Sequence, residues 1–129
     1  MASEPRASES YLCIATLLPM RRWRDLVPLA LLGHRVRNQA AAAPGNVAYA
    51  TRSDFLRKQF RTLTIWRDRE SINVFVRAEP HATAVRRMAE WAADGGAFAE
   101  WTSESPKLDW SEARRRLQAP TFYYRKPAT

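Results

Sequence analysis

Hydrophobic and polar residues alternate with two periods along this chain, and the changes between them mark its elements. Residues 11–18 form a continuous apolar run rich in β-formers, which predicts a buried strand. Residues 47–52 and 59–66 alternate with period two and predict two further strands. Because these two strands follow one another closely, they favour an antiparallel hairpin. A fourth strand is predicted at residues 98–102.

Helical spacing replaces the strand period in four places. The predicted helices span residues 26–43, 69–78, 80–93 and 109–118. Asp25 and Asp68 stand where a side-chain N-cap is expected. Pro44 and Gly45 end the first helix, and Pro80 starts the third.

The element order is therefore β-α-β-β-α-β with an extra C-terminal helix. This order predicts an α+β, ferredoxin-like fold, in which helices cover one face of an antiparallel four-stranded sheet. We expect a single domain over residues 11–120. Residues 1–10 are predicted to be a disordered leader, and residues 121–129 a tail.

Both faces of the first strand are largely apolar. Residues 11, 13, 15 and 17 lie on one side, and residues 12, 14, 16 and 18 on the other. Helices can cover only one of these faces, so the other requires a second layer. A homodimer with two sheets packed face to face would supply that layer.

The composition limits the compartment and the chemistry. The chain has 129 residues, no apolar run long enough to span a bilayer, and no apolar signal core. Its single cysteine, Cys13, excludes an internal disulfide, and with the other features it predicts a cytoplasmic protein. No pair of histidines, pair of cysteines or carboxylate cluster has metal-ligand spacing, so we expect no bound metal.

The formal net charge of +8 makes polyanions worth considering. The arginines are spread along the chain between acidic residues, and no zinc-finger, phosphate-loop or aromatic RNA-binding pattern occurs. This distribution argues against nucleic acid and for a solvated basic surface, while an anionic substrate or partner stays open.

His81 is the principal chemical candidate. A neutral imidazole can act as a base near neutral pH or can ligate iron. The alternative is a structural histidine that packs at the helix start and bonds a backbone carbonyl. Trp66, Trp23 and Phe75 are aromatic residues that could line a cavity beside His81. Further candidates for substrate binding are His34, Arg22 and Arg61, the two arginines because a guanidinium suits a carboxylate.

Three segments carry a resemblance to a known group of proteins. They are AAAAPGNVAYA (40–50), FRTLTIWRDRESINVFVRAEPHATAVRRM (60–88) and AFAEW (97–101). With them the chain resembles the dimeric α/β-barrel superfamily, in particular antibiotic-biosynthesis-monooxygenase-like and spheroidene-monooxygenase-like domains. The resemblance covers most of residues 11–105.

The resemblance implies a pocket between the sheet and its helices. It does not imply one reaction, because the relatives catalyse several. Relatives include cofactor-free oxygenases of polycyclic aromatics, heme-degrading enzymes, heme-containing carotenoid oxygenases and polyketide cyclases. The heme-degrading relatives carry their axial histidine further along the helix, where this chain has Val85 one turn after His81. That role cannot be transferred from them. The Pro-His motif instead matches the spheroidene-monooxygenase-like group.

The leading hypothesis is an oxygenase or related tailoring enzyme of secondary metabolism, without a cofactor, acting on a hydrophobic aromatic or polyene molecule. His81 would be its base. Heme binding, with His81 as the iron ligand, is the first alternative. A non-catalytic protein that binds a small ligand or a polyanion is the second.

Overall fold

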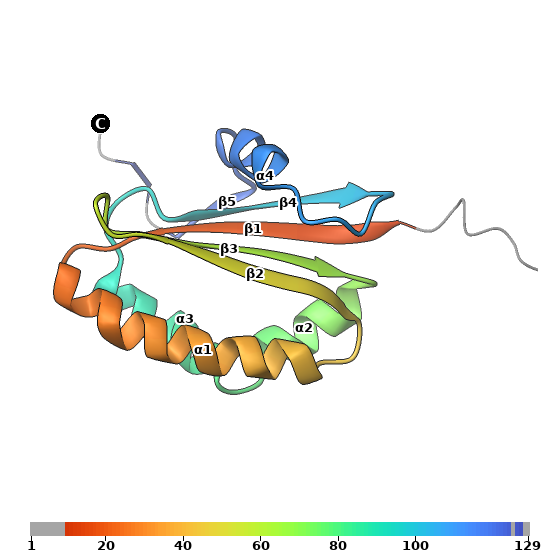
Figure 1. Ribbon diagram of the computed structural model, residues 1–129, viewed down its shortest axis with the longest axis horizontal. Helices are drawn as coiled ribbons and strands as arrows, with labels where there is room; N and C mark the ends of the chain where they lie inside the picture. The colour runs from red at the N-terminus through yellow and green to blue at the C-terminus, as the bar shows by residue number, and fades with distance from the viewer. Residues whose placement is uncertain (1–9, 125, 128–129) are drawn as a thin grey trace, which may run out of the picture.

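One antiparallel sheet of five strands forms the centre of the fold (Figure 1). The computed structural model of the chain describes residues 10–124, 126 and 127. The strands are β1 (Tyr11–Pro19), β2 (Asn46–Asp54), β3 (Gln59–Trp66), β4 (Ala97–Ser103) and β5 (Phe122–Tyr123). They lie in the order β2-β3-β1-β4-β5. The predicted four strands and their hairpin are confirmed, and the short fifth strand was not expected.

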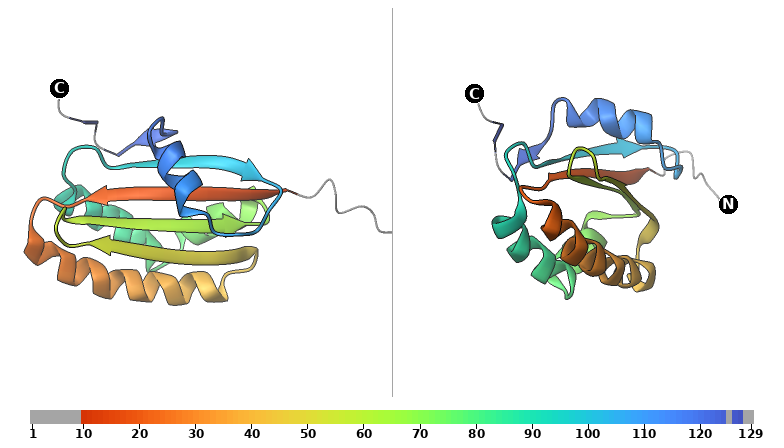
Figure 2. Two further views of the ribbon diagram at one scale, coloured as in Figure 1. Left: turned by 45° about the horizontal axis from the view of Figure 1, so that its top comes forward. Right: turned by 60° about the vertical axis from the view of Figure 1, so that its left-hand side comes forward.

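The helices lie on both faces of the sheet (Figures 1 and 2). They are the 3-10 helix η2 (Trp23–Asp25), α1 (Leu26–Ala42), α2 (Arg69–Arg77), α3 (His81–Trp91) and α4 (Trp110–Leu117). The first three α-helices cover one face, and α4 crosses the other (Figure 2). The predicted ferredoxin-like arrangement with an extra C-terminal helix is confirmed.

The two predicted N-caps, Asp25 and Asp68, have different outcomes. Asp68 caps α2 as predicted, since its Oδ1 accepts a hydrogen bond from the backbone N–H of Ser71 at 2.8 Å. The predicted cap at Asp25 is wrong. Asp25 belongs to η2 and makes no capping bond. Its carboxylate instead accepts a hydrogen bond from Nε of Arg22 at 3.0 Å.

The ends of the chain and the hairpin differ in detail from expectation. The turn between β2 and β3 was predicted at residues 53–54, but β2 continues through Asp54 and the turn comprises residues 55–58, while β3 has the predicted bounds. Apart from Ser10, the predicted leader lies outside the described residues. The predicted tail at 121–129 contributes β5, which pairs with β4.

The main core lies between the sheet and helices α1, α2 and α3. Alternate residues of β1 and β3 face these helices, among them Leu18 and Phe60, which pair across the two strands. They pack with Leu29, Met88 and Trp91 from α1 and α3. The period-two pattern of the strands thus meets the apolar faces of the helices.

A second apolar cluster lies on the opposite face, beneath α4. Cys13, Ala15, Leu63 and Ile65 are 1–3% exposed, and Ala113 of α4 packs against them. Part of the face for which a second sheet was predicted is thus already covered within the chain. The C-terminal helix provides this cover, although the sequence did not indicate where that helix would pack. The homodimer with its two sheets packed face to face stays a prediction.

A charge placed between α4 and the sheet should show how much the packing of α4 stabilises the fold. We expect Ala113→Asp to lower the free energy of unfolding by about 2–3 kcal/mol, because it buries a polar group without a partner. Arg114→Asp on the same helix replaces an exposed residue and should change it by less than about 0.5 kcal/mol. Urea unfolding followed by circular dichroism measures both. Equal effects would contradict the packing of α4 described above.

Cys13 has the buried position that the sequence predicted. Burial raises the pKa of its thiol, and the nearby Arg116 opposes that shift. Among residues 10–124, 126 and 127, no helix has the length and apolar character needed to cross a membrane.

Candidate functional site

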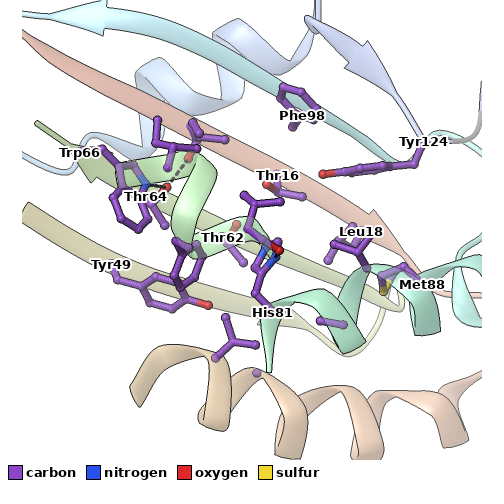
Figure 3. A pocket seen from close by; sticks show the side chains of 18 of the residues that line it. Thr16, Leu18, Tyr49, Thr62, Thr64, Trp66, His81, Met88, Phe98 and Tyr124 are labelled. Atoms are coloured by element: carbon purple, nitrogen blue, oxygen red, sulfur yellow. Dashed lines mark hydrogen bonds between the residues drawn. The ribbon is translucent and has the colours of Figure 1, made fainter. Parts of the chain in front are cut away.

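A cavity of about 540 Å³ lies between the inner face of the sheet and helices α1, α2 and α3 (Figure 3). Its size falls in the usual range of small-molecule sites, about 300–1,000 Å³. Aliphatic and aromatic side chains form most of the wall, among them Leu29, Val36, Ile72 and Met88. The cavity is thus suited to a hydrophobic ligand that meets only a few polar groups.

Three threonines provide polar groups on the sheet side. Thr16 of β1 lies directly opposite Thr62 of β3, and Thr64 follows two residues later on the same face. The Thr64 hydroxyl is already used, because it accepts a hydrogen bond from Nε1 of Trp66 at 2.9 Å. The period of β3 directs Thr62 and Thr64 to one face, and the pairing of β1 with β3 places Thr16 beside them.

Trp66, Phe75 and His81 form a continuous aromatic wall. The ring centroids of Trp66 and Phe75 are 4.9 Å apart, and those of Phe75 and His81 are 4.8 Å apart. All three residues line the cavity. Trp66 is 1% exposed, so its ring is almost completely packed by neighbouring atoms. The end of β3, the last turn of α2 and the start of α3 therefore meet at this wall.

Gln39 of α1 holds the start of α3 in place. Its Oε1 accepts a hydrogen bond from the backbone N–H of His81 at 2.9 Å, and its Nε2 donates to the carbonyl of Phe75 at 3.0 Å. One side chain thus joins α1 to the end of α2 and the beginning of α3. This clamp fixes the backbone of His81, and Figure 3 shows the His81 side chain rising from α3 toward the sheet.

The hydrogen bond of the His81 ring determines which nitrogen is available. Nδ1 lies 3.3 Å from the carbonyl oxygen of Val76. A carbonyl can only accept, so this contact places the proton on Nδ1 and leaves a lone pair on Nε2. Burial lowers the pKa of His81 below its ordinary value, and the bond to Val76 opposes this. At neutral pH the ring is a neutral base.

The lowered pKa of His81 has a consequence for stability. Unfolding releases the ring to water, where its pKa returns to about 6.5, so below this pH the unfolded chain binds more protons than the folded one. We expect the free energy of unfolding to fall as pH decreases from about 6.5 toward the folded-state pKa. The difference between wild type and His81→Gln, measured by urea unfolding across this range, should show the loss. A difference independent of pH would contradict a buried neutral ring.

Two tyrosines add hydroxyl groups to the cavity wall. Burial raises the pKa of Tyr49 to about 12, with Arg37 opposing, and burial raises that of Tyr124 to about 12, opposed by a hydrogen bond with Thr16. Both phenols therefore keep their protons at neutral pH and can donate a hydrogen bond to a ligand. Tyr124 follows β5, and its backbone N–H donates to the carbonyl of Gly96 at 2.7 Å.

An ion pair connects two sides of the cavity. Arg69, the first residue of α2, donates from Nη1 to Oε1 of Glu100 on β4 at 3.0 Å, and both residues line the cavity. Arg69 is about half exposed while the Glu100 side chain is mostly buried. The pair therefore bridges the helical layer and the sheet where solvent reaches the cavity.

Four of the seven predicted site residues lie outside the cavity. Trp23 is 61% exposed, and its Nε1 donates to the carbonyl of Phe55 at 2.7 Å. His34 is exposed on α1, one position from Gly33, which does line the cavity.

The two predicted arginines also lie outside the cavity. Arg22 pairs with Asp25. Arg61 lies on the α4 side of β3, since Thr62 and Phe60 beside it face the helices. These placements do not support substrate-binding roles for the four residues.

Several cavity residues were missed by sequence reasoning. Tyr49 and the threonines follow the alternation of the predicted strands, so their shared side could have been found, but the sequence analysis did not decide which side faces the helices. Gln39 and the Arg69–Glu100 pair depend on contacts between elements distant in sequence. Tyr124 gave no signal, because its segment has no period and was expected to be a tail.

The comparison with solved structures bears on the fold, while the two sequence comparisons found no match. No protein-family model matches the sequence, and no curated protein does. Among solved structures, a candidate antibiotic biosynthesis monooxygenase from Nitrosomonas europaea is similar, with a TM-score of 0.66 at 13% identity over 78% of this chain and 95% of that one. SnoaB, a cofactor-independent oxygenase from Streptomyces nogalater, has a TM-score of 0.56 at 9% identity over 74% of this chain and 94% of that one.

A conserved protein from Methanosarcina mazei is similar as well, with a TM-score of 0.64 at 10% identity over 74% of this chain and 94% of that one. The fold of the antibiotic-biosynthesis-monooxygenase-like proteins, inferred from sequence, is thus confirmed. At these identities the similarity establishes the fold alone, because one fold supports many reactions.

Proposed function

We propose that the protein is an oxygenase that acts on a hydrophobic, aromatic or polyene small molecule in the cavity beside His81. The observation that supports it most is the combination of an apolar cavity of about 540 Å³ with a neutral histidine whose Nδ1 is held by a carbonyl. The similarity to a cofactor-independent oxygenase is consistent with this proposal.

The chemistry requires only a base and dioxygen. Nε2 of His81 removes a phenolic or enolic proton, and the resulting anion is electron-rich enough to transfer an electron to dioxygen. The radical pair then combines, and loss of water leaves a carbonyl. Overall, a CH₂ group and O₂ become C=O and H₂O, so the atoms and electrons balance without an added reductant. The apolar wall excludes water from the anion, and the Tyr49 hydroxyl can donate a hydrogen bond to it.

Anthrone tests the proposal, because it is a flat tricyclic molecule with an enol tautomer and one CH₂ to oxidise. We expect the purified protein to consume oxygen with anthrone and, under ¹⁸O₂, to place one labelled atom in anthraquinone and release the other as water. Added chelator should not change the rate. Oxygen uptake no faster than in buffer, across a set of flat phenols and enols, would overturn the proposal.

Heme binding is the second candidate, and the His81 ring is the observation that favours it. An imidazole whose Nδ1 donates to a carbonyl presents Nε2 to a metal, as in many metal sites. Arg69 and Arg77 line the cavity and could pair with propionates. When bound, heme would supply a redox-active iron. Here His81 would hold the iron, and the aromatic wall of Trp66 and Phe75 would pack against the ring.

An optical titration with hemin separates the two candidates. Heme ligation predicts a Soret band that is lost in His81→Ala and kept in His34→Ala, the matched control on the outer side of α1. A hemin spectrum that the protein does not change, or a protein-induced Soret band unaffected by either substitution, would exclude His81 as a ligand. Protein that binds anthrone without consuming oxygen would instead indicate a non-catalytic binding protein.

A further inference from the structure

Two segments distant in sequence meet at one end of the molecule. Figures 1 and 2 show the β2–β3 turn at the same end as the start of α1. The backbone N–H of Met20 donates to the carbonyl of Lys58 at 2.7 Å, and Nε1 of Trp23 donates to the carbonyl of Phe55 at 2.7 Å. We call residues 21–24 and 55–58 together the hairpin patch.

The turn in this patch has a defined geometry. Oδ1 of Asp54 accepts a hydrogen bond from the backbone N–H of Arg57 at 3.1 Å, and the N–H of Lys58 donates to the carbonyl of Phe55 at 3.3 Å. Lys58 takes a φ of 56°, a left-handed conformation that closes the turn. Phe55 and Leu56 consequently stand at its tip.

Three large apolar side chains of the hairpin patch face water. Leu56 is 91% exposed, Phe55 65% and Trp23 61%. Hydrophobic residues at the tip of a tight turn do not stabilise the monomer, because they contact too little of it. Transfer of such side chains out of water is favourable, so the tip would gain from an apolar environment that it could enter.

Cationic side chains surround the apolar tip. The hairpin patch holds Arg21, Arg22, Arg24, Arg57 and Lys58. The neighbouring acids Asp25 and Asp54 pair with Arg22 and Arg57, so five cations against two anions leave a net charge of +3. Nζ of Lys58 lies 5.0 Å from the centre of the Trp23 ring, which places charge directly beside the apolar surface.

We propose that the hairpin patch binds the surface of an anionic lipid bilayer, with Leu56, Phe55 and Trp23 entering the headgroup boundary. Protruding apolar side chains ringed by basic residues are the features that interfacial binding requires. Nucleic acid would use the same cations and could stack on Phe55 or Trp23, but it would leave Leu56, the most exposed of the three side chains, in water, whereas a bilayer takes in all three. The test therefore depends on Leu56.

Sedimentation of the full chain with vesicles tests the proposal. We expect binding to phosphatidylcholine mixed with phosphatidylglycerol, much weaker binding to phosphatidylcholine alone, and a decline as salt rises. Leu56→Asp should lower the partition coefficient by at least about tenfold, because it removes apolar insertion and adds repulsion. Val74→Asp places the same charge on an exposed valine of α2 and should have little effect.

A second pair of variants tests the charges. Arg24→Glu should weaken binding several-fold, and Arg114→Glu, at an exposed position of α4, much less. No binding to mixed vesicles at low salt would overturn the proposal. So would equal loss with Val74→Asp, or binding to a DNA duplex stronger than to vesicles and unaffected by Leu56→Asp. Because Leu56 is exposed, circular dichroism should show all variants folded. The result is independent of the proposed oxygenase activity, which uses another part of the molecule.

Discussion

Replacement of His81 by glutamine should lower kcat/KM for anthrone by about 100- to 10,000-fold, the usual contribution of a positioned general base. Glutamine retains polarity and nearly the size of the ring but cannot take a proton at neutral pH. In the wild type, the bond from Nδ1 to Val76 leaves Nε2 as the basic nitrogen. The measurement is initial oxygen uptake at several anthrone concentrations.

The chain offers a matched control for this change, because its other histidine lies outside the cavity. His34→Gln should leave kcat/KM within about twofold of wild type, since surface changes far from a site rarely matter. The wild-type profile should lose activity only as pH falls below about 6.5, because burial lowers the pKa of His81 and the neutral form is the active one. Equal effects of the two substitutions would contradict the role of His81.

Trp66→Ala should produce the largest loss of stability, about 3–5 kcal/mol in the free energy of unfolding. The ring is 1% exposed, packs 4.9 Å from Phe75 and donates a hydrogen bond to Thr64. Removal of the ring enlarges the cavity beside it and eliminates both the packing against Phe75 and the hydrogen bond to Thr64. Urea unfolding followed by circular dichroism gives the value without relying on tryptophan emission.

Trp23→Ala is the corresponding control, because Trp23 is 61% exposed. It loses one hydrogen bond and a cation–π contact with Lys58, so the expected change is about 1 kcal/mol or less. A Trp66→Ala protein as stable as Trp23→Ala would show that Trp66 is not part of the wall described above.

The strands were predictable because period two specifies both their existence and their faces. The alternation through residues 59–66 placed Trp66 on the same side as Thr62 and Thr64, which is where the structure has them. The helix at α2 was predictable from Asp68 and the apolar spacing after it. With the Pro-His segment following directly, His81 could be placed at the start of α3 and beside the aromatic wall.

Other features depend on packing between distant segments, which a local pattern does not contain. The sequence showed that both faces of β1 are apolar, but it could not show that α4 of the same chain covers one of them. The direction of the Trp23 side chain is set by the 3-10 turn before α1. No residue pattern in the sequence predicts that turn, so the sequence could not show on which side of α1 Trp23 lies. Gln39 contacts His81 across 42 positions, so no local rule identifies it.

The most direct test of the account is the protonation of His81 in solution, followed by ¹⁵N NMR with the signals assigned through His81→Gln. We predict a neutral ring at pH 7 with its proton on Nδ1, a pKa below 6.5, and a changed Nε2 shift when a flat phenol enters the cavity. A proton on Nε2, a pKa above 6.5, or signals indifferent to every such ligand would contradict it.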